Sequence, residues 1–302
     1  MNLKLCSTRS VAALAAMAFV AAACGDTGPT SRGSLTIAGL NSPKSTILAD
    51  IYGQALAHDG YSITYRLLAG SRDAVVPALE AGLVDLYPGL AATDLEFYNK
   101  SAGEANGYAG STTAKLISHL QPLGLTALTP SMAADEYAFA VTKATQTKYN
   151  LTRLEDLAAI AGQLTLGAGP DCATAAFCAP GLSKTYGINF RSVRALDTDG
   201  PLTRAAFADG SIDVGLVLSG DGDLDSLGLV VLQDDLHLEK ADNVVPILRQ
   251  AAANPEVTKV LNAIDAKLST ADLTTMNNQI STLKQDAAAV ATAWLQQHHY
   301  WS

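Results

Sequence analysis

Three aspartates at alternate positions, Asp221, Asp223 and Asp225, have the spacing with which a calcium-binding EF-hand loop begins. Such a loop needs a glycine at its sixth position and a bidentate glutamate at its twelfth. Ser226 and Leu232 stand at these two positions, so the pattern does not predict a calcium site. We expect neither a bound metal nor a cofactor.

The motifs that commonly carry catalysis are also missing from the sequence. There is no Gly-x-Ser-x-Gly turn for a serine nucleophile, no His-Glu-x-x-His zinc motif and no phosphate-binding loop ending in Gly-Lys-Ser or Gly-Lys-Thr. The histidines are scattered among polar neighbours or lie at the C-terminus, where we expect them to be solvated. We therefore predict no catalytic residues and a chain that binds its ligand without transforming it.

Residues 1–23 have the composition of an export signal. A short basic start precedes a small and apolar run at 11–23, which is too short to span a bilayer. The run ends in VAAAC, which resembles a bacterial lipobox and predicts acylation of Cys24 and anchoring to the outer face of the cell membrane. A plain signal peptide beside an unrelated cysteine is the alternative. Residues 24–33 are rich in Gly, Pro, Ser and Thr and are predicted to be a flexible tether.

Cys172 and Cys178 lie six positions apart in the segment GPDCATAAFCAPGL. Apart from Cys6 and Cys24 they are the only cysteines, and an exported chain meets oxidising conditions. A zinc site would need more ligands at metal spacing, and no histidine is nearby. We predict a disulfide that closes a short loop and fixes the turn after a strand.

A polar turn near the start of the mature chain has the residue types that hold an anionic group. Asn41 and Ser42 precede a helical pattern at 47–56, and Ser42 or Ser45 could cap its N-terminus. Free N–H groups at such a terminus suit an anionic ligand group. Capping alone is an equally good interpretation.

One pattern occurs twice, and the predicted elements are arranged around it. ALEAGLVDLYPGL at 78–90 and AFADGSIDVGLVL at 206–218 each run from a helix end through a glycine to an aspartate and a short apolar strand. The glycine can take the left-handed conformation that ends a helix. Two such units predict an α/β fold with two similar lobes and a ligand cleft at the carboxyl ends of their strands.

The order of these elements predicts a hinged clamp in which the chain crosses twice between the lobes. Residues 34–135 and 233–302 are assigned to lobe I, and 136–232 to lobe II. Pro88 is expected to end the first repeat strand, which would place Tyr87 at a strand end facing the cleft. Further strands are predicted at 34–40, 61–68, 137–142, 164–169, 192–196, 229–232 and 243–249, and helices at 73–81, 151–161, 202–208 and 286–297.

Composition excludes two classes of protein. The chain is 48% hydrophobic and 16% charged, which is far from the composition of disordered chains. Its formal net charge is −9, and such a surface repels phosphate backbones, so we expect no nucleic-acid partner. We also expect a monomer.

With these features the chain resembles the osmoprotectant family of ABC-importer substrate-binding proteins, which take up glycine betaine, choline or carnitine. The similarity is strongest in LAGSRDAVVPALEAGLVDLYPG, in DEYAFAVTK and in the run at 167–249, which includes TDGPLTRAAFADGSIDVGL and NVVPILR. The resemblance implies a type II periplasmic-binding fold that closes on a small-molecule solute and docks on a membrane permease.

In that family a cage of aromatic rings holds a quaternary ammonium by cation–π attraction, and polar groups hold the carboxylate. The resemblance carries Tyr87 and Tyr137 over as cage walls, and Ser71 where the family usually has a threonine. The other candidate ligand-binding residues are Asn41, Ser42, Lys44, Ser45, Pro88, Asp171, Leu218 and Ser219.

Three segments depart from the family pattern. Gly89 and Leu90 replace a usual Glu-Tyr, and Leu218 stands where betaine-binding members carry a tyrosine. The first turn, usually Asn-Phe-Thr-Glu-Gln, reads NSPKS. Losing two aromatic walls would cost about one to three decades of affinity for a methylated ammonium. A wider cleft for an aromatic, polyphenolic or polyol solute is therefore an alternative, with Lys44 serving an anionic or phenolic group. In a third interpretation Lys44 is solvated and Tyr87 is partly core.

The leading hypothesis is a lipid-anchored receptor that delivers a compatible solute such as glycine betaine, choline or carnitine to the permease of an ABC importer. The alternative from another class is a sensor or interaction module that presents its lobes to a membrane partner without uptake.

Overall fold

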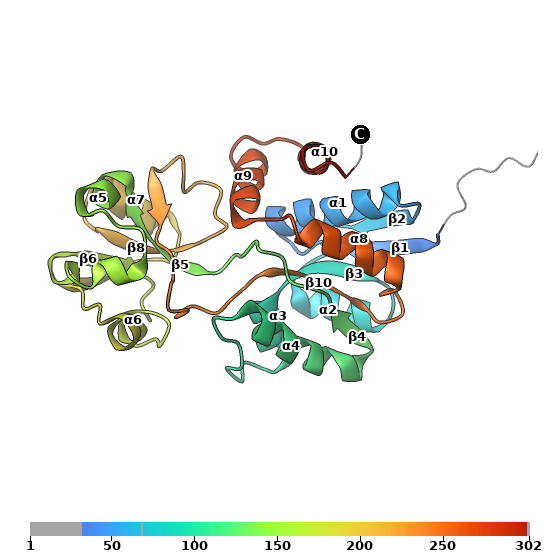
Figure 1. Cartoon of the computed structure of the whole chain (residues 1–302), viewed down its shortest axis with the longest axis horizontal. Coiled ribbons are helices and arrows are strands. Elements are labelled where there is room, and N and C mark those ends of the chain that lie inside the picture. The colour runs from blue at the N-terminus through green and yellow to red at the C-terminus, as the bar shows by residue number, and fades with distance from the viewer. Residues whose placement is uncertain (1–31, 68, 301–302) are drawn as a thin grey trace, which may run out of the picture. The chain divides into compact units, whose positions relative to one another are not determined.

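Two five-stranded sheets with helices packed on them form the framework of this computed structural model, which describes residues 32–67 and 69–300 (Figure 1). The first sheet has the order β2-β1-β3-β10-β4, and the second has β7-β6-β8-β5-β9. The predicted α/β fold with two lobes is confirmed. The strands are β1 (Ser34–Ala38), β2 (Ser62–Arg66), β3 (Leu86–Leu90), β4 (Leu125–Ala127), β5 (Tyr137–Thr142), β6 (Thr165–Ala168), β7 (Ser192–Ala195), β8 (Val214–Leu218), β9 (Leu229–Val231) and β10 (Val244–Arg249). The α-helices are α1 (Pro43–His58), α2 (Arg72–Glu80), α3 (Ala91–Tyr98), α4 (Ala109–Leu120), α5 (Lys143–Tyr149), α6 (Ala179–Tyr186), α7 (Pro201–Ala208), α8 (Pro255–Asp265), α9 (Thr270–Ser281) and α10 (Ala287–Gln297).

The two sheets have the same topology. In the first, β1 pairs in parallel with β2 and β3, and β10 pairs antiparallel with β3 and β4. In the second, β6 pairs in parallel with β7 and β8, and β5 pairs antiparallel with β8 and β9. The antiparallel strand of each sheet directly follows a crossing of the chain from the other sheet.

The aspartate of the repeated pattern has the same structural task in both sheets. The Asp85 carboxylate accepts a hydrogen bond from the Thr36 backbone N–H at 2.8 Å, and the Asp85 N–H donates to the Thr36 carbonyl. Asp213 makes the same two bonds with Thr165, again with the carboxylate at 2.8 Å. Each aspartate thus ties the start of the repeat strand to its neighbour, which explains why the pattern needs this residue.

The glycines of the repeat end the preceding helices as predicted. Gly82 has φ of 72° and Gly210 has φ of 70°, in the left-handed region that favours glycine.

The prediction that Pro88 ends its strand is wrong. β3 continues to Leu90, and Pro88 lies opposite Pro246 of β10. In an antiparallel ladder every second opposing pair exchanges no hydrogen bonds, so two prolines can face each other without losing a donor. The Pro246 carbonyl points to the other side and accepts from Leu128 N at 3.0 Å.

The single helix predicted at 151–161 is also wrong. This segment contains two short 3₁₀ turns, Leu154–Leu157 and Ala161–Gln163. Asp156 accepts the N–H groups of Thr152 and Arg153 at 2.8 Å, a local bond that favours a tight turn over a continuous helix. Helix α5, which precedes this segment, was missed.

The part of the predicted tether that the structure describes is held by ion pairs. Arg32 contacts Asp59 at 2.8 Å and Glu256 at 3.0 Å, and its backbone N–H donates to Gly60. The predicted signal peptide and Cys24 lie outside the described residues.

The predicted disulfide between Cys172 and Cys178 is present, with both side chains buried in the core of the second sheet. It closes the turn between β6 and α6, and the Ala179 N–H donates to the Cys172 carbonyl at 3.1 Å within it. The bond therefore fixes a turn, as the sequence indicated.

Replacing both cysteines by alanine is expected to lower the free energy of unfolding by about 2 kcal/mol, because the cross-linked loop is short. Urea denaturation of the oxidised protein and of the variant measures this difference. Wild-type protein unfolded under reducing conditions is the matched control, since it keeps both side chains. A loss above about 5 kcal/mol in the reduced wild type would contradict the modest role assigned to this loop.

Candidate functional site

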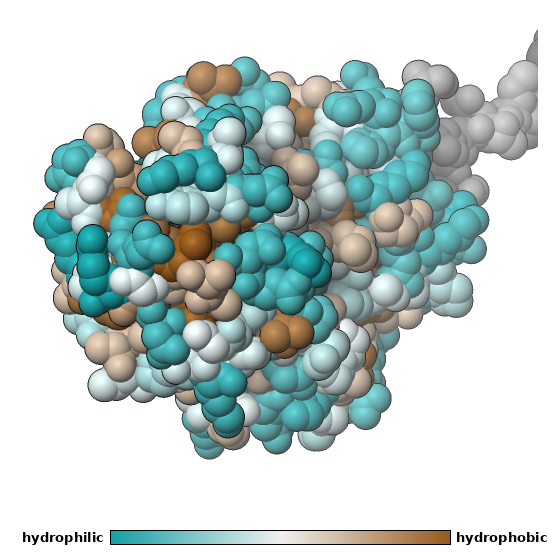
Figure 2. All heavy atoms as spheres, turned by 60° about the vertical axis from the view of Figure 1, so that its left-hand side comes forward, coloured by the Kyte–Doolittle hydropathy of each residue, from teal (hydrophilic) through white to brown (hydrophobic). Residues whose placement is uncertain are grey.

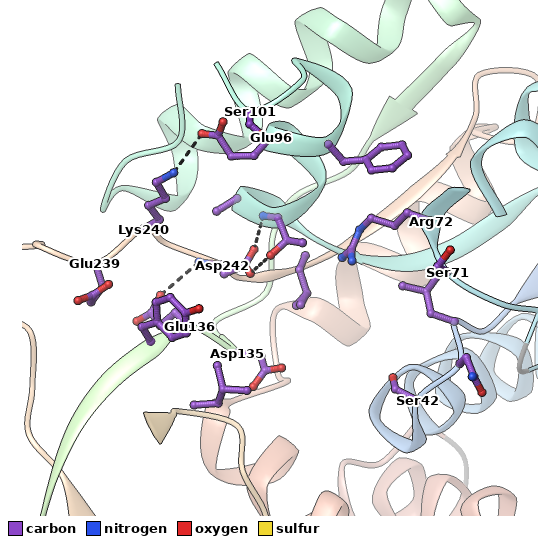
Figure 3. A pocket seen from close by; sticks show the side chains of 18 of the residues that line it. Ser42, Ser71, Arg72, Glu96, Ser101, Asp135, Glu136, Glu239, Lys240 and Asp242 are labelled. Carbon is purple, nitrogen blue, oxygen red and sulfur yellow. Dashed lines mark hydrogen bonds and ion pairs between the residues drawn. The ribbon is translucent and has the colours of Figure 1, made fainter. Parts of the chain in front are cut away.

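A cleft of about 1070 Å³ lies where the two chain crossings pass between the sheets (Figure 3). The start of α2, the end of β3 and helix α3 contribute from the first sheet. The start of β5, the disulfide loop and the end of β8 contribute from the second. The lining residues are Leu40, Asn41, Ser42, Gly70, Ser71, Arg72, Asp73, Leu90, Ala92, Thr93, Glu96, Phe97, Ser101, Asp135, Glu136, Tyr137, Phe177, Leu218, Glu239, Lys240 and Asp242. Figure 2, which brings the second sheet forward, shows a recess in which apolar atoms are framed by hydrophilic ones.

An aromatic pair covers the second-sheet side of the cleft. Tyr137, the first residue of β5, stacks on Phe177 with ring centroids 5.0 Å apart and an interplanar angle of 29°. Phe177 belongs to the loop that the disulfide closes, so this covalent bond positions the ring. Leu218 lies opposite Tyr137 in the ladder between β5 and β8. The structure therefore places Tyr137 and Leu218 in the cleft, together with Phe177, which the sequence reasoning missed.

Two helix N-termini face the first-sheet side of the cleft. Ser42 caps α1, because its Oγ accepts from the Ser45 N–H at 3.2 Å, and Asn41 precedes it. Ser71 precedes α2 and makes no side-chain cap, and its hydroxyl donates to the Asp73 carboxylate at 3.2 Å. The hydroxyl of Ser45 instead accepts from the Leu40 N–H at 2.7 Å. Ser42 has the predicted capping role, while Ser45 fixes the turn.

Lys44 is half-buried and paired. Its ammonium lies 2.6 Å from a carboxylate oxygen of Asp135, at the first crossing between the sheets. Lys44, Ser45 and Pro88 line a smaller pocket of about 130 Å³, which shares Ser42 and Asp135 with the main cleft. The ion pair links α1 to the crossing segment, so Lys44 has a protein partner where an anionic solute group was one expectation.

Tyr87 does not line either of these two pockets, and its predicted place as a cage wall is wrong. Its side chain is 0% exposed, and its hydroxyl donates to Asp94 at 2.8 Å. Because β3 continues past Tyr87, the ring points into the core between the sheet and its helices. Burial raises the pKa of Tyr87, which keeps the hydroxyl protonated as a donor.

Asp94 collects four hydrogen bonds behind the cleft. Its carboxylate accepts from the Arg72 guanidinium at 2.6 and 3.2 Å, from the Tyr87 hydroxyl and from the Leu90 N–H at 2.7 Å. A Cβ added at Gly89 would lie 2.7 Å from an Asp94 oxygen and 2.4 Å from the end of Ile247. Gly89, which stands where the resemblance leads us to expect a glutamate, therefore leaves the space that the Asp94 carboxylate occupies.

Two further candidates line neither pocket. Ser219 donates to the Ala134 carbonyl at 3.0 Å and accepts from the Glu136 N–H at 3.1 Å, so it joins the end of β8 to the first crossing. The Asp171 carbonyl accepts from the N–H groups that follow it in the disulfide loop. In this structure neither residue lines the cleft, and their predicted contact with a ligand stays a prediction.

Carboxyl groups dominate the wall formed by the two crossings. Burial raises the pKa of Glu136, and the Glu136 side chain accepts from the Asp242 N–H at 3.2 Å. Burial raises the pKa of Glu239 to about 9, with further contributions from the charges of Asp234 and Glu136. Burial also raises the pKa of Asp242 to about 7, although bonds from Thr93 oppose the shift.

The cationic side chains of the cleft are already paired. The Lys240 ammonium reaches Glu96 at 3.3 Å (Figure 3), and Arg72 is held by Asp94. The remaining carboxyl groups lie beside the aromatic pair, and a carboxyl that ionises when a cation binds would stabilise a cationic ligand group.

The three aspartates that resemble the start of a calcium loop serve another purpose. Asp221 and Asp223 bind the Arg204 guanidinium at 2.7 and 2.6 Å. Among the described residues, no group of three or more His, Cys, Asp or Glu side chains is placed to hold a metal ion. In the same part of the chain, every helix is too short or too polar to cross a membrane.

Two sheets of the same topology, joined by two crossings of the chain beside a cleft, have the architecture of the two-lobed periplasmic binding proteins. Residues 33–297 match the family model described as the substrate binding domain of ABC-type glycine betaine transport systems, and the chain belongs to this family. Its membership assigns it to solute binding for ABC transport.

Known proteins that are similar to this chain match either most of its length or about half of it. The glycine betaine-binding protein YehZ of Escherichia coli is 24% identical over 84% of this chain and 87% of its own. Its apo structure covers 89% of this chain and 99% of its own at 22% identity, with a TM-score of 0.80. A structure titled as a glycine betaine/carnitine/choline ABC transporter is 25% identical, covers 89% of this chain and 100% of its own, and has a TM-score of 0.76. The ergothioneine transport permease and binding protein EgtU of Helicobacter pylori is 27% identical over 53% of this chain and 29% of its own.

Proposed function

We propose that this protein is the extracytoplasmic receptor of an ABC importer that captures a cationic or zwitterionic compatible solute and delivers it to the permease. Glycine betaine, choline and carnitine are the solutes named for its relatives and structural neighbours. The receptor binds without catalysis and works as a monomer.

The observation that carries this proposal is the stacked pair of Tyr137 and Phe177 beside an acidic wall inside the cleft. An aromatic face attracts a cationic nitrogen, and a neighbouring carboxyl that ionises on binding adds to this attraction. Ser42 and Ser71, at the helix N-termini across the cleft, suit the carboxylate of a zwitterion. The two ends of a betaine-like solute therefore meet complementary groups on the two sheets.

The lipobox-like sequence supports anchoring through an acylated Cys24, which would hold the receptor at the outer face of the membrane near the permease. Mass spectrometry of the membrane-associated protein tests this part of the proposal. An unmodified Cys24, or cleavage elsewhere, would contradict it.

Replacing Tyr137 by alanine is expected to weaken solute binding by about 2- to 30-fold, because one ring face is worth about 0.5–2 kcal/mol. Phe177→Ala is expected to act similarly, since each ring supports the other. Isothermal titration calorimetry with glycine betaine, choline, carnitine and ergothioneine measures the change.

Tyr87→Phe is the matched control for this experiment, since it alters an aromatic residue that lies in the core. We expect it to leave affinity unchanged and to lower only stability. The proposed function fails if no solute of the panel gives heat or raises the melting temperature, because a ligand that binds the folded form must stabilise it.

A further inference from the structure

One oxygen of Glu239 lies at the cleft without a hydrogen-bond partner. Glu239 lines the cleft in the segment that returns the chain to the first sheet, and it is 4% exposed. Its Oε1 is buried and receives no donor from the described part of the chain. An unpaired buried acceptor costs about 1–3 kcal/mol, so a ligand that supplies a donor would gain this free energy.

Among the described residues, no cationic side chain forms an ion pair with Glu239. The neighbouring Lys240 turns toward Glu96, away from Glu239 (Figure 3). The other cationic side chains that line the cleft and the adjoining pocket pair with different carboxylates, Arg72 with Asp94 and Lys44 with Asp135.

The surroundings of Glu239 favour a positive ligand over a negative one. The charges of Asp234 and Glu136 raise the pKa of Glu239, and the ammonium of Lys240, although paired with Glu96, lowers it. The ring of Tyr137 lines the same cleft. Burial raises the pKa of Tyr137, and the charges of Asp171 and Glu239 raise it further, so the carboxyl of Glu239 and this ring share one environment. Both residues line the cleft, so a cation bound between them is close to the carboxyl and to the ring.

The aromatic pair alone is a poor cage for a fully methylated nitrogen. Tyr137 and Phe177 stack on each other, so each ring uses one face on its partner and has one left for a ligand. A quaternary ammonium also has no N–H to give to a buried oxygen, and it would leave the Glu239 Oε1 unpaired.

We propose that Glu239, Tyr137 and Phe177 form a subsite for a cationic nitrogen that keeps at least one N–H, such as a protonated amine, and that Glu239 accepts a hydrogen bond from it. This inference rests on the proposed function, because it specifies the nitrogen chemistry of the solute in the same cleft. Glu239 is then the residue that determines specificity between methylated and N–H-bearing nitrogens.

Two pairs of solutes that differ by one methyl group test the preference. Choline is compared with N,N-dimethylethanolamine, and glycine betaine with N,N-dimethylglycine, by calorimetry on the wild-type protein at pH 7. We expect the N–H-bearing member of each pair to bind about tenfold more tightly, since it satisfies a buried charged or polar acceptor.

Glu239→Gln is expected to remove most of this preference, because an amide cannot carry the compensating negative charge. Glu80→Gln, at an exposed position of α2 outside both pockets, is the matched control and should keep the wild-type preference. Tyr137→Ala should weaken both members of a pair, because the ring attracts either nitrogen.

Proton release by the wild-type protein provides a measurement that does not depend on a folded variant. An uncharged Glu239 must ionise to pair with the cation, so binding releases a proton and affinity rises with pH between pH 6 and 8, by about tenfold per pH unit at most. Calorimetry in buffers of different ionisation enthalpy detects the released proton.

The outcomes separate the two proposals. This inference is overturned, and the proposed function stands, if choline and glycine betaine bind more tightly than their N–H-bearing partners. The same conclusion follows if binding of the N–H-bearing partners releases no proton. Binding of none of the four solutes overturns both.

Discussion

Replacing Asp94 by alanine is expected to lower the free energy of unfolding by about 3–5 kcal/mol, the cost of breaking a buried ion pair and leaving a charge uncompensated. Asp94 is 0% exposed and accepts hydrogen bonds from Arg72, Tyr87 and the Leu90 backbone. Its loss would leave three donors behind the cleft without their acceptor. Urea denaturation followed by circular dichroism measures the change.

The control for this experiment separates the ion pair from the hydrogen bonds. Asp94→Asn keeps the size of the side chain and one carbonyl acceptor, so we expect a smaller loss than with alanine. Tyr87→Phe removes only the bond at 2.8 Å and should cost about 0.5–1.5 kcal/mol or slightly more for a charged acceptor. An Asp94→Ala protein within about 1 kcal/mol of wild type would show that Arg72 finds another partner in the open cleft.

The ligand-free protein is expected to lose stability as the pH rises from 5 to 9. Burial raises the pKa of Asp242 to about 7 from an ordinary 3.8, and burial raises that of Glu239 to about 9 from 4.5. A raised carboxyl pKa means that the folded state binds more protons than the unfolded state, so its contribution is present at low pH and is lost as the pH rises through the raised pKa. For Asp242 the loss between pH 5 and 8.5 is about 3 kcal/mol.

Asp242→Asn tests the origin of this loss. The variant cannot ionise, so its free energy of unfolding should fall by about 3 kcal/mol less than that of wild type between pH 5 and 8.5. Asp225→Asn changes a side chain that is 88% exposed and should leave the wild-type pH dependence in place. If the free energy of unfolding fell equally with pH in wild type and Asp242→Asn, ionisation of Asp242 would not be the cause of the loss.

The lobes could be predicted from the sequence because they rest on local patterns. A glycine after a helix, an aspartate three positions later and an apolar strand occur twice, and each residue has a backbone task that recurs in the structure. The two crossings followed from the order of the strands. Pro88 was misjudged because the consequence of its missing N–H depends on the partner strand, and Pro246 of β10 lies 158 positions further along the chain.

The cleft could be predicted only in part. The polar turn at Asn41 and Ser42 and the residue Tyr137 lie at ends of helices and strands that the sequence predicts, and both line the cleft. The segments DE at 135–136 and EKAD at 239–242 have the composition of solvated loops, and only the tertiary crossing brings their carboxyl groups together. Phe177 could have been predicted from the sequence. It lies between the two cysteines of the predicted disulfide, and a short closed loop holds an aromatic ring in a fixed direction.

The place of β10 determines the order in which the sheets can assemble. β10 lies between β3 and β4, and β4 has no other partner in its sheet. The strands of the second sheet come from one continuous stretch, 137–231, whereas β10 follows only at Val244–Arg249. A chain synthesised from its N-terminus can therefore finish the second sheet while the first still lacks β10, the strand that joins β3 to β4. Any interruption before residue 244 would leave β4 unattached and the first sheet with three strands.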